Sequence, residues 1–240
     1  MHFYALIAQR HMHEYGSTSR QFGMVAVSER EHAILNDKAL MKKPMSIEEH
    51  QASRPIAEPF RLFDCCIESD GAAAYVVSAA DAARDRPRKP AWILGIAEGH
   101  PDSPSSVATR RELLRTGVGM AAPRAFAMAG IAPRDLRAAM LYDPFSFLVI
   151  AQLEALGYCA PGEGGPFVES GGIRLGGKLP VNTHGGLLSQ AHSMSAINHI
   201  CEAVKQLRGT AGKAQLAQAS PLAVTGNGDF GDGAVAVLAN

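Results

Sequence analysis

Short apolar segments with the length of strands alternate with longer helical segments over residues 90–240, and this order restricts the fold. The segments expected to be strands are 91–97, 138–142, 222–225 and 234–238. The segments expected to be helices are 121–129, 145–156 and 193–207. Strands that alternate with helices bury their apolar faces by stacking in layers. The sequence therefore predicts an α/β layered fold.

The part of the chain before residue 90 begins with helices. The expected elements are helices over 1–15, 19–35 and 78–84 and a strand over 71–77. Ser46 and Glu49 have the spacing of a capping box and predict a further helix start. Residues 86–90 contain two prolines and three basic residues, as a linker does. We therefore divide the chain into residues 1–89 and 90–240.

A short repeated sequence is relevant to this division of the chain. Asp70-Gly71-Ala72 precedes an apolar run, and Asp232-Gly233-Ala234 does the same near the end of the chain. The match is short enough to arise by chance. Alternatively, the fold is duplicated and each half ends on such a strand. In that case the second half is complete and the first half lacks its beginning.

Composition excludes several classes of protein. The 23 Lys and Arg residues balance the 23 Asp and Glu residues, so no basic surface for nucleic acid or an anionic membrane is expected. Every apolar run is shorter than the roughly 20 residues that span a bilayer. The four cysteines form no Cys-x-x-Cys pair, so no zinc or other metal site is expected. Vicinal Cys65 and Cys66 suit a disulfide poorly, which favours a reducing cytoplasm.

Residues 182–192, Asn-Thr-His-Gly-Gly-Leu-Leu-Ser-Gln-Ala-His, resemble the thiolase signature Asn-x-x-Gly-Gly-x-x-x-x-Gly-His. Three further segments agree in order with the sterol-carrier-protein-x and lipid-transfer-protein type of thiolase: 64–72, 142–145 and 206–209. Tyr142-Asp143-Pro144-Phe145 lies where these proteins carry His-Asp-x-Phe and ordinary thiolases carry Asn-Glu-x-Phe. The resemblance implies a thiolase-like α/β/α fold with a complete C-terminal half and a truncated N-terminal half.

The sequence departs from the thiolase pattern at several positions. The resemblance places the nucleophilic cysteine of thiolases in the first half, before the region where this chain begins. Residues 226–229 have no match to the second thiolase cysteine, and Ala191 and Ser193 replace a glycine and a proline that flank the signature histidine. The missing part is expected either to have been trimmed or to belong to another chain.

Chemistry beside a thioester carbonyl requires an oxyanion donor and a group that moves a proton. By resemblance, His192 is the oxyanion donor and the partner of the absent cysteine; alternatively, it is a structural histidine that caps a helix. Tyr142 ends a predicted strand, where its phenol can donate to an enolate or hold a water molecule. The alternative for Tyr142 is a packed side chain with its hydroxyl at the surface.

The remaining candidates surround this pair. Asn182 is expected to hold the signature loop, and His184 either contacts the substrate or shapes the turn. Gly185 and Gly186 allow the backbone to approach an acyl group closely, although both also suit a plain turn. Asp143 either caps the following helix, which we favour, or orients the neighbouring loop.

Other polar features are weaker candidates. Inert burial is favoured over reactivity for Cys65 and Cys66, and Cys159 is a weaker spare nucleophile. The glycine-rich stretch 158–180 is expected to be a long functional loop. Residues 226–233 do not suit phosphate, because two aspartates and a following strand oppose it.

Three functions follow from these residues and the resemblance. The first is a thiolase-type acyltransferase that cleaves or forms C–C bonds in lipid, steroid or aromatic acyl-CoA metabolism. The second is a retro-aldolase of the same family that works with a small zinc-ribbon and OB-fold partner protein. The third is a non-catalytic subunit that binds acyl-CoA or lipid. A coenzyme A thioester is the expected substrate, no covalently bound cofactor is expected, and a homo-oligomer or a complementary thiolase chain is expected as partner.

Overall fold

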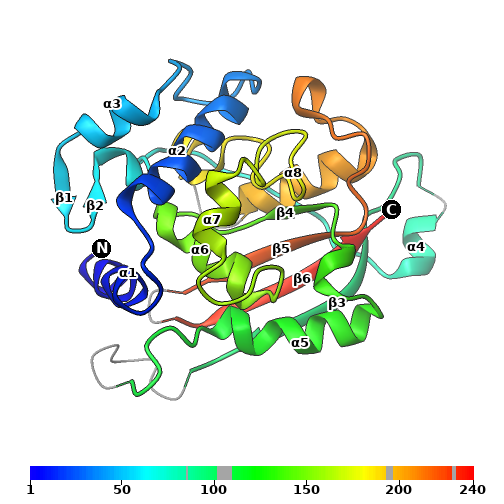
Figure 1. Ribbon diagram of the computed structural model, residues 1–240. Coiled ribbons are helices and arrows are strands. Elements are labelled where there is room, and N and C mark those ends of the chain that lie inside the picture. The colour runs from blue at the N-terminus through cyan, green and yellow to red at the C-terminus, as the bar shows by residue number, and fades with distance from the viewer. Residues whose placement is uncertain (85, 102–109, 193–196, 229–230) are drawn as a thin grey trace.

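A mixed sheet of four strands in the order β3-β6-β5-β4 forms the centre of the molecule, seen in the computed structural model of Figure 1. The structure describes residues 1–84, 86–101, 110–192, 197–228 and 231–240. The strands are β3 (Trp92–Gly99), β4 (Ala138–Met140), β5 (Leu222–Asn227) and β6 (Gly233–Ala239). β6 pairs antiparallel with β3 and β5, whereas β4 and β5 are parallel. All four predicted strands of residues 90–240 are confirmed.

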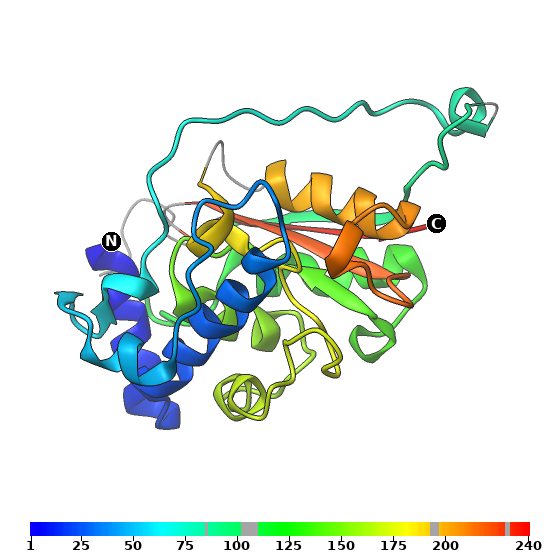
Figure 2. The ribbon, with the colours of Figure 1, turned by 90° about the horizontal axis from the view of Figure 1, so that it is seen from above.

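The two faces of this sheet carry separate apolar cores. Alternate residues of a strand point to opposite faces. Ala139 packs into the larger core with α5 (Gly117–Ala129) and α6 (Ser146–Ala155), while Met140 packs into a smaller core with α8 (Ile197–Arg208). Figure 2 shows helices on both sides of the sheet. The layered α/β/α arrangement is therefore confirmed.

The first helices form as their local signals predict. They are α1 (His2–Tyr15), α2 (Ser19–Ile34) and α3 (Ile47–Ala52). Gly16 ends α1 with φ 74°, a left-handed conformation that glycine adopts without a Cβ clash. The predicted Ser46–Glu49 capping box starts α3, and Thr18 with Gln21 forms a second one at α2. These caps satisfy backbone N–H groups that a helix leaves without partners.

The remaining elements are short. A two-stranded hairpin consists of β1 (Pro55–Ala57) and β2 (Phe60–Arg61), and α4 (Ala80–Arg84) precedes the predicted linker. The 3₁₀ turns are η1 (Leu62–Asp64), η3 (Pro133–Asp135) and η5 (Gly212–Ala214), and η4 (Gly186–Gln190) is one π-helical turn.

The expected strand over 71–77 is wrong. These residues have no strand partner among the described parts of the chain, and Tyr75, Val76 and Val77 are 49%, 93% and 68% exposed. Figure 2 shows the chain here as an extended trace on the α8 side of the sheet, leading to α4. Strand composition favours a pleated, half-buried surface, but a strand forms only where a neighbour supplies hydrogen bonds. The described parts of the chain supply none.

Other boundaries differ less. The glycine-rich stretch 158–180 is not an open loop, because α7 (Gly164–Glu169) forms within it. α5 begins four residues before the predicted position, because Thr116 caps it and accepts a hydrogen bond from Gly119 N–H. Residues 193–196, where a helix was expected to begin, lie outside the described residues. No helix in the described part of the chain has the length and apolar character needed to cross a bilayer.

Candidate functional site

The signature loop starts at Asn182, which follows a bridge between Val181 and Ala139 of β4. Asn182 is fully buried and adopts φ 49°, which is unusual for a residue with a side chain. Its amide Oδ1 accepts from Leu141 N–H at 2.7 Å, and its Nδ2 donates to Leu141 O and to Glu29 Oε1, both at 2.8 Å. Asn182 therefore holds the loop against β4 and α2; direct contact with substrate stays a prediction.

Asp143 does not cap a helix, contrary to the preferred expectation. α6 begins at Ser146, and its N-cap residue makes no side-chain cap. Instead the fully buried Asp143 carboxylate accepts from the N–H groups of Leu187 at 2.7 Å and Leu188 at 3.2 Å. Its other oxygen lies 2.8 Å from His199 Nε2 of α8. Asp143 therefore orients the signature loop, which was the alternative expectation.

Glu29 is a buried acid that was not among the predicted site residues. It lies on α2, is fully buried, and accepts a hydrogen bond from Asn182. Burial raises the pKa of Glu29 well above its ordinary value, and the charge of Asp143 raises it further. Burial beside a second acid therefore favours the protonated, neutral form of Glu29. Its only sequence signal is an acidic residue on the apolar side of a predicted helix.

Gly186 packs closely against this acid pair, and Gly185 packs against Ala33 of α2. Gly185 and Gly186 have φ values of 103° and 60°, respectively. A Cβ at Gly186 would lie 2.2 Å from Asp143 Oδ2 and 2.4 Å from Glu29 Oε2, and one at Gly185 would lie 2.5 Å from Ala33 Cβ. Both glycines therefore let the loop approach α2 and Asp143. Their approach to an acyl group stays a prediction.

His192, at the end of the loop, is held by the segment that follows η1. Its N–H donates to Ser69 Oγ at 2.8 Å, and its backbone forms a parallel bridge with Glu68. The imidazole Nδ1 lies 3.2 Å from the thiol sulfur of Cys66. The position of the half-buried ring is therefore set by residues far away in the sequence.

Tyr142 lies beside this histidine. The two rings meet edge to face with centroids 6.3 Å apart. The Tyr142 backbone is fixed on both sides, because its N–H donates to Thr225 Oγ1 at 3.0 Å and its carbonyl accepts from Gln152 Nε2 at 2.7 Å. The side chain is only 8% exposed. The structure thus brings together the two residues that the sequence predicts to be catalytic.

Cys66 is the third side chain at this point, although inert burial was favoured for it. Its thiol is free and half-buried. Burial, and then the charge of Asp143, raises the pKa of Cys66 to about 11, so the thiol is protonated at neutral pH. Because Cys66 and His192 are 126 positions apart, no local pattern could predict this contact.

His184 points into the interior rather than joining Tyr142 and His192 in a ring contact. It is buried, its ring lies 4.9 Å from that of His199, and neither ring nitrogen has a hydrogen-bond partner among the described residues. Burial, and then the neighbouring His199, lowers the pKa of His184 well below its ordinary value. A neutral imidazole therefore occupies this position, and substrate contact by His184 stays a prediction.

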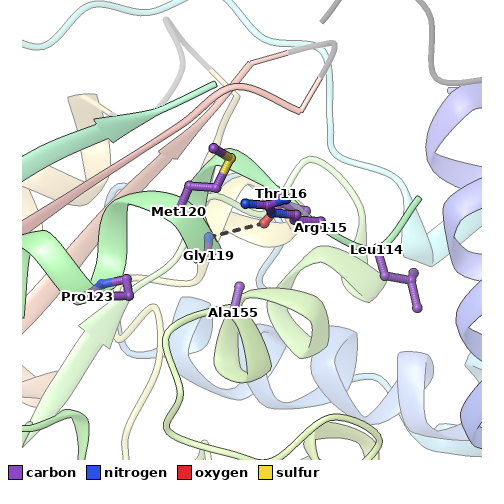
Figure 3. A pocket seen from close by; sticks show the side chains of 7 residues that line it. All are labelled: Leu114, Arg115, Thr116, Gly119, Met120, Pro123 and Ala155. Atoms are coloured by element: carbon purple, nitrogen blue, oxygen red, sulfur yellow. Dashed lines mark hydrogen bonds between the residues drawn. The ribbon is translucent and has the colours of Figure 1, made fainter. Parts of the chain in front are cut away.

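The described residues contain no group of three or more His, Cys, Asp or Glu side chains that could hold a metal ion. A cavity of about 420 Å³ lies between α5 and α6, lined by Thr116, Met120 and Ala155 among others (Figure 3). None of the predicted site residues lines this cavity, so it is separate from the Tyr142–His192 pair.

Residues 99–240 match the thiolase C-terminal domain-like family, and the chain belongs to that family. Among curated relatives it is 46% identical over 210 residues to a steroid side-chain-cleaving aldolase of Thermomonospora curvata. It is 47% identical over 210 residues to the 17-hydroxy-3-oxo-4-pregnene-20-carboxyl-CoA lyase of Mycobacterium tuberculosis. Each alignment covers 86% of this chain and 54% of the relative. The chain therefore spans about half the length of these relatives.

Solved structures agree with this family. The Ltp2-ChsH2(DUF35) aldolase superposes with a TM-score of 0.94 and is 42% identical, covering 99% of this chain and 62% of that one. A monomeric SCP2-thiolase-like protein of Mycobacterium smegmatis, at 17% identity, covers 99% of this chain and 51% of that one with a TM-score of 0.71. The second likeness concerns the fold alone.

Proposed function

We propose that this chain is the catalytic C-terminal part of an acyl-CoA lyase that cleaves a C–C bond by a retro-aldol reaction. The observation that carries the proposal is the edge-to-face pair of Tyr142 and His192, in a chain 46% and 47% identical to an aldolase and a CoA lyase. Thiolytic cleavage was the first expectation from the sequence, and these relatives favour the aldolase alternative.

The proposed reaction needs two proton movements and one stabilised oxyanion. A base takes the proton from the hydroxyl on the β carbon of the acyl-CoA, and the C–C bond then breaks to leave a carbonyl compound and a thioester enolate. His192 donates to the enolate oxygen, because an imidazole N–H at this position stabilises the developing charge. Tyr142 delivers the proton that converts the enolate into the shortened acyl-CoA.

The surroundings suit these roles. Tyr142 follows β4, and hydrogen bonds from its backbone to Thr225 and Gln152 fix its backbone position. Asp143 fixes the loop that leads to His192. Two donors fixed before the reaction need no costly reorganisation as charge develops. A steroid is the proposed acyl group, because both relatives are named for steroid substrates.

A partner protein is part of this proposal. The solved relative is a complex of Ltp2 with ChsH2(DUF35). We therefore propose that the complete protein works with a DUF35-type partner. The resemblance likewise implied a partner protein.

A thiolase-type acyltransferase is the second candidate. It is favoured by 38% identity over 216 residues to an acetyl-CoA acetyltransferase of Methanothermobacter thermautotrophicus, a match that covers 56% of that relative. The two candidates differ in what Tyr142 does. In a thiolase, cysteine and histidine share the proton transfers, so the phenol is dispensable.

Two variants test the proposal in the complete protein with its partner. His192→Ala is expected to lower turnover about 100- to 1000-fold, as the loss of an oxyanion donor does. Tyr142→Phe is expected to lower turnover about 100- to 10,000-fold, as the loss of a general acid does. Thermal unfolding of both variants should stay near that of the unmodified protein.

Matched controls are His100→Ala and Tyr75→Phe, because the His100 side chain is 66% exposed and Tyr75 is 49% exposed. Both controls should keep normal turnover. Near-normal turnover of Tyr142→Phe, with a severe loss in His192→Ala, would favour the acyltransferase instead.

A further inference from the structure

We propose that Cys66 is a positioning residue for His192, whose thiol hydrogen bond fixes the imidazole with its hydrogen on Nε2. The inference rests on the proposed function, since it concerns the histidine assigned there as oxyanion donor. The motivating observation is the distance of 3.2 Å between Cys66 Sγ and His192 Nδ1. Nothing in the family signature, which covers residues 182–192, involves this cysteine.

The direction of the hydrogen bond follows from the two groups. The pKa of the Cys66 thiol, raised by burial to about 11, keeps its hydrogen on sulfur at neutral pH. A neutral imidazole has one nitrogen that donates and one that accepts, whereas a thioether or thiol sulfur accepts only weakly. The arrangement S–H to Nδ1 therefore pairs the better acceptor with the available donor. The other tautomer would give sulfur the weaker role of acceptor.

This direction determines what His192 can do. When Nδ1 accepts, the ring hydrogen must lie on Nε2. An oxyanion donor needs an N–H that points at the substrate. Nδ1 of His192 already accepts the hydrogen bond from Cys66, so it cannot be that donor. Cys66 thus leaves Nε2–H as the donor for the enolate oxygen. A histidine with its hydrogen on Nδ1 would turn an acceptor toward that oxygen and repel it.

The backbone around Cys66 keeps the thiol in place. Cys66 N–H donates to Pro144 O at 3.0 Å, which ties it to the residues that follow Tyr142. Ser69, three residues later, accepts the N–H of His192 itself at 2.8 Å. One short segment therefore holds both the backbone and the imidazole of His192, as second partners of functional histidines do in metal sites.

Cys65 offers a matched control. It is also half-buried and free, but its sulfur lies 3.6 Å from Arg61 O. Burial raises the pKa of Cys65 to about 12, so both thiols are neutral at pH 7. The two neighbours thus share chemistry and exposure and differ in the contact with His192.

The experiment uses the complete protein with ¹⁵N-labelled histidine and compares Cys66→Ala, Cys66→Ser and Cys65→Ala. The ¹⁵N shifts of the imidazole, assigned by the signal lost in His192→Gln, report which ring nitrogen carries the hydrogen. The unmodified protein should show His192 protonated on Nε2. Cys66→Ala should mix the tautomers and lower turnover about 3- to 10-fold, the usual worth of one hydrogen bond. Cys66→Ser keeps a hydrogen-bond donor and should restore the Nε2 tautomer and the turnover. Cys65→Ala should change neither the tautomer nor the turnover.

The other possible results also decide whether Cys66 fixes the tautomer of His192. An Nδ1-protonated His192 in the unmodified protein overturns the inference, even if Cys66→Ala fails to fold. An unchanged tautomer or unchanged turnover in Cys66→Ala also overturns it, as does an equal effect of Cys65→Ala. If the tautomer responds to Cys66 but the unmodified protein cleaves no acyl-CoA, the proposed function fails while the hydrogen-bond assignment stands.

Discussion

The substitution Glu29→Gln should change how the stability of this protein depends on pH. Glu29 is fully buried on α2, where it pairs with the Asp143 carboxylate and accepts from Asn182 at 2.8 Å. A glutamine has the same shape, since its carbonyl can accept from Asn182 and its amide can donate to Asp143. The substitution therefore keeps the hydrogen bonds and removes only the titration.

The size of the change in stability with pH follows from the coupling between folding and proton binding. Burial and Asp143 raise the pKa of Glu29 above the ordinary value of 4.5, so the folded protein keeps the Glu29 proton to higher pH than the unfolded chain does. Between these two pKa values the folded state binds one proton more, and its stability falls as pH rises. The slope approaches about 1.4 kcal/mol per pH unit for one proton. Glu29→Gln removes this slope. The free energy of unfolding of the variant therefore increases relative to that of the unmodified protein as pH rises above about 4.5.

Urea unfolding followed by circular dichroism between pH 5 and pH 8 measures the difference. The control is Glu31→Gln, on the same helix, because the Glu31 side chain is 48% exposed and pairs with Arg174 at the surface. Its stability difference from the unmodified protein should stay nearly constant over this range. A difference for Glu29→Gln that also stays constant with pH would refute the assignment of a buried, protonated Glu29.

Three further predictions concern the loop and the exposed segment. Gly186→Ala should destabilise the fold by more than about 1 kcal/mol, because its Cβ would lie 2.2 Å from Asp143 Oδ2. The control is Gly176→Ala, which has open space around the new Cβ and is opposed only by its φ of 85°. Thermal unfolding compares the two variants. Asp143→Ala should cost about 3 kcal/mol or more in urea unfolding, because it strands two buried N–H groups and His199; a cost under 1 kcal/mol would contradict this role. The exposed apolar run 71–77 should make the isolated chain associate, as light scattering can test; a clean monomer at micromolar concentration would contradict it.

The sequence predicts those parts of the fold that depend on local signals. The capping box at Ser46 and the glycine at position 16 act within one helical turn, so both helix boundaries were predictable. The strands β5 and β6 were predictable because each has apolar residues of strand length bounded by turns. The same reasoning failed over 71–77, where composition favours a strand but no neighbouring strand is present among the described residues.

The site was predictable only where a family motif marks it. Tyr142 and His192 lie in motifs, and the structure brings their rings together. Glu29 lies in no family motif, and the segment 64–72 that contains Cys66 does not indicate its role, because both roles come from contacts with residues more than 100 positions away. The role of Asp143 was ambiguous for the same reason, since a helix cap and a long-range loop contact have the same local sequence. Tertiary contacts between distant segments decide these cases.

The central claim is that the complete protein cleaves a C–C bond by retro-aldol chemistry, and the need for free coenzyme A tests it directly. The complete protein with its partner is incubated with a β-hydroxyacyl-CoA of steroid type, in the absence of free coenzyme A, and the products are separated by mass. Retro-aldol cleavage predicts a shortened acyl-CoA and a carbonyl compound in equal amounts, at a rate that added coenzyme A does not raise. Cleavage only of a β-ketoacyl-CoA, and only when free coenzyme A is supplied, would contradict the account.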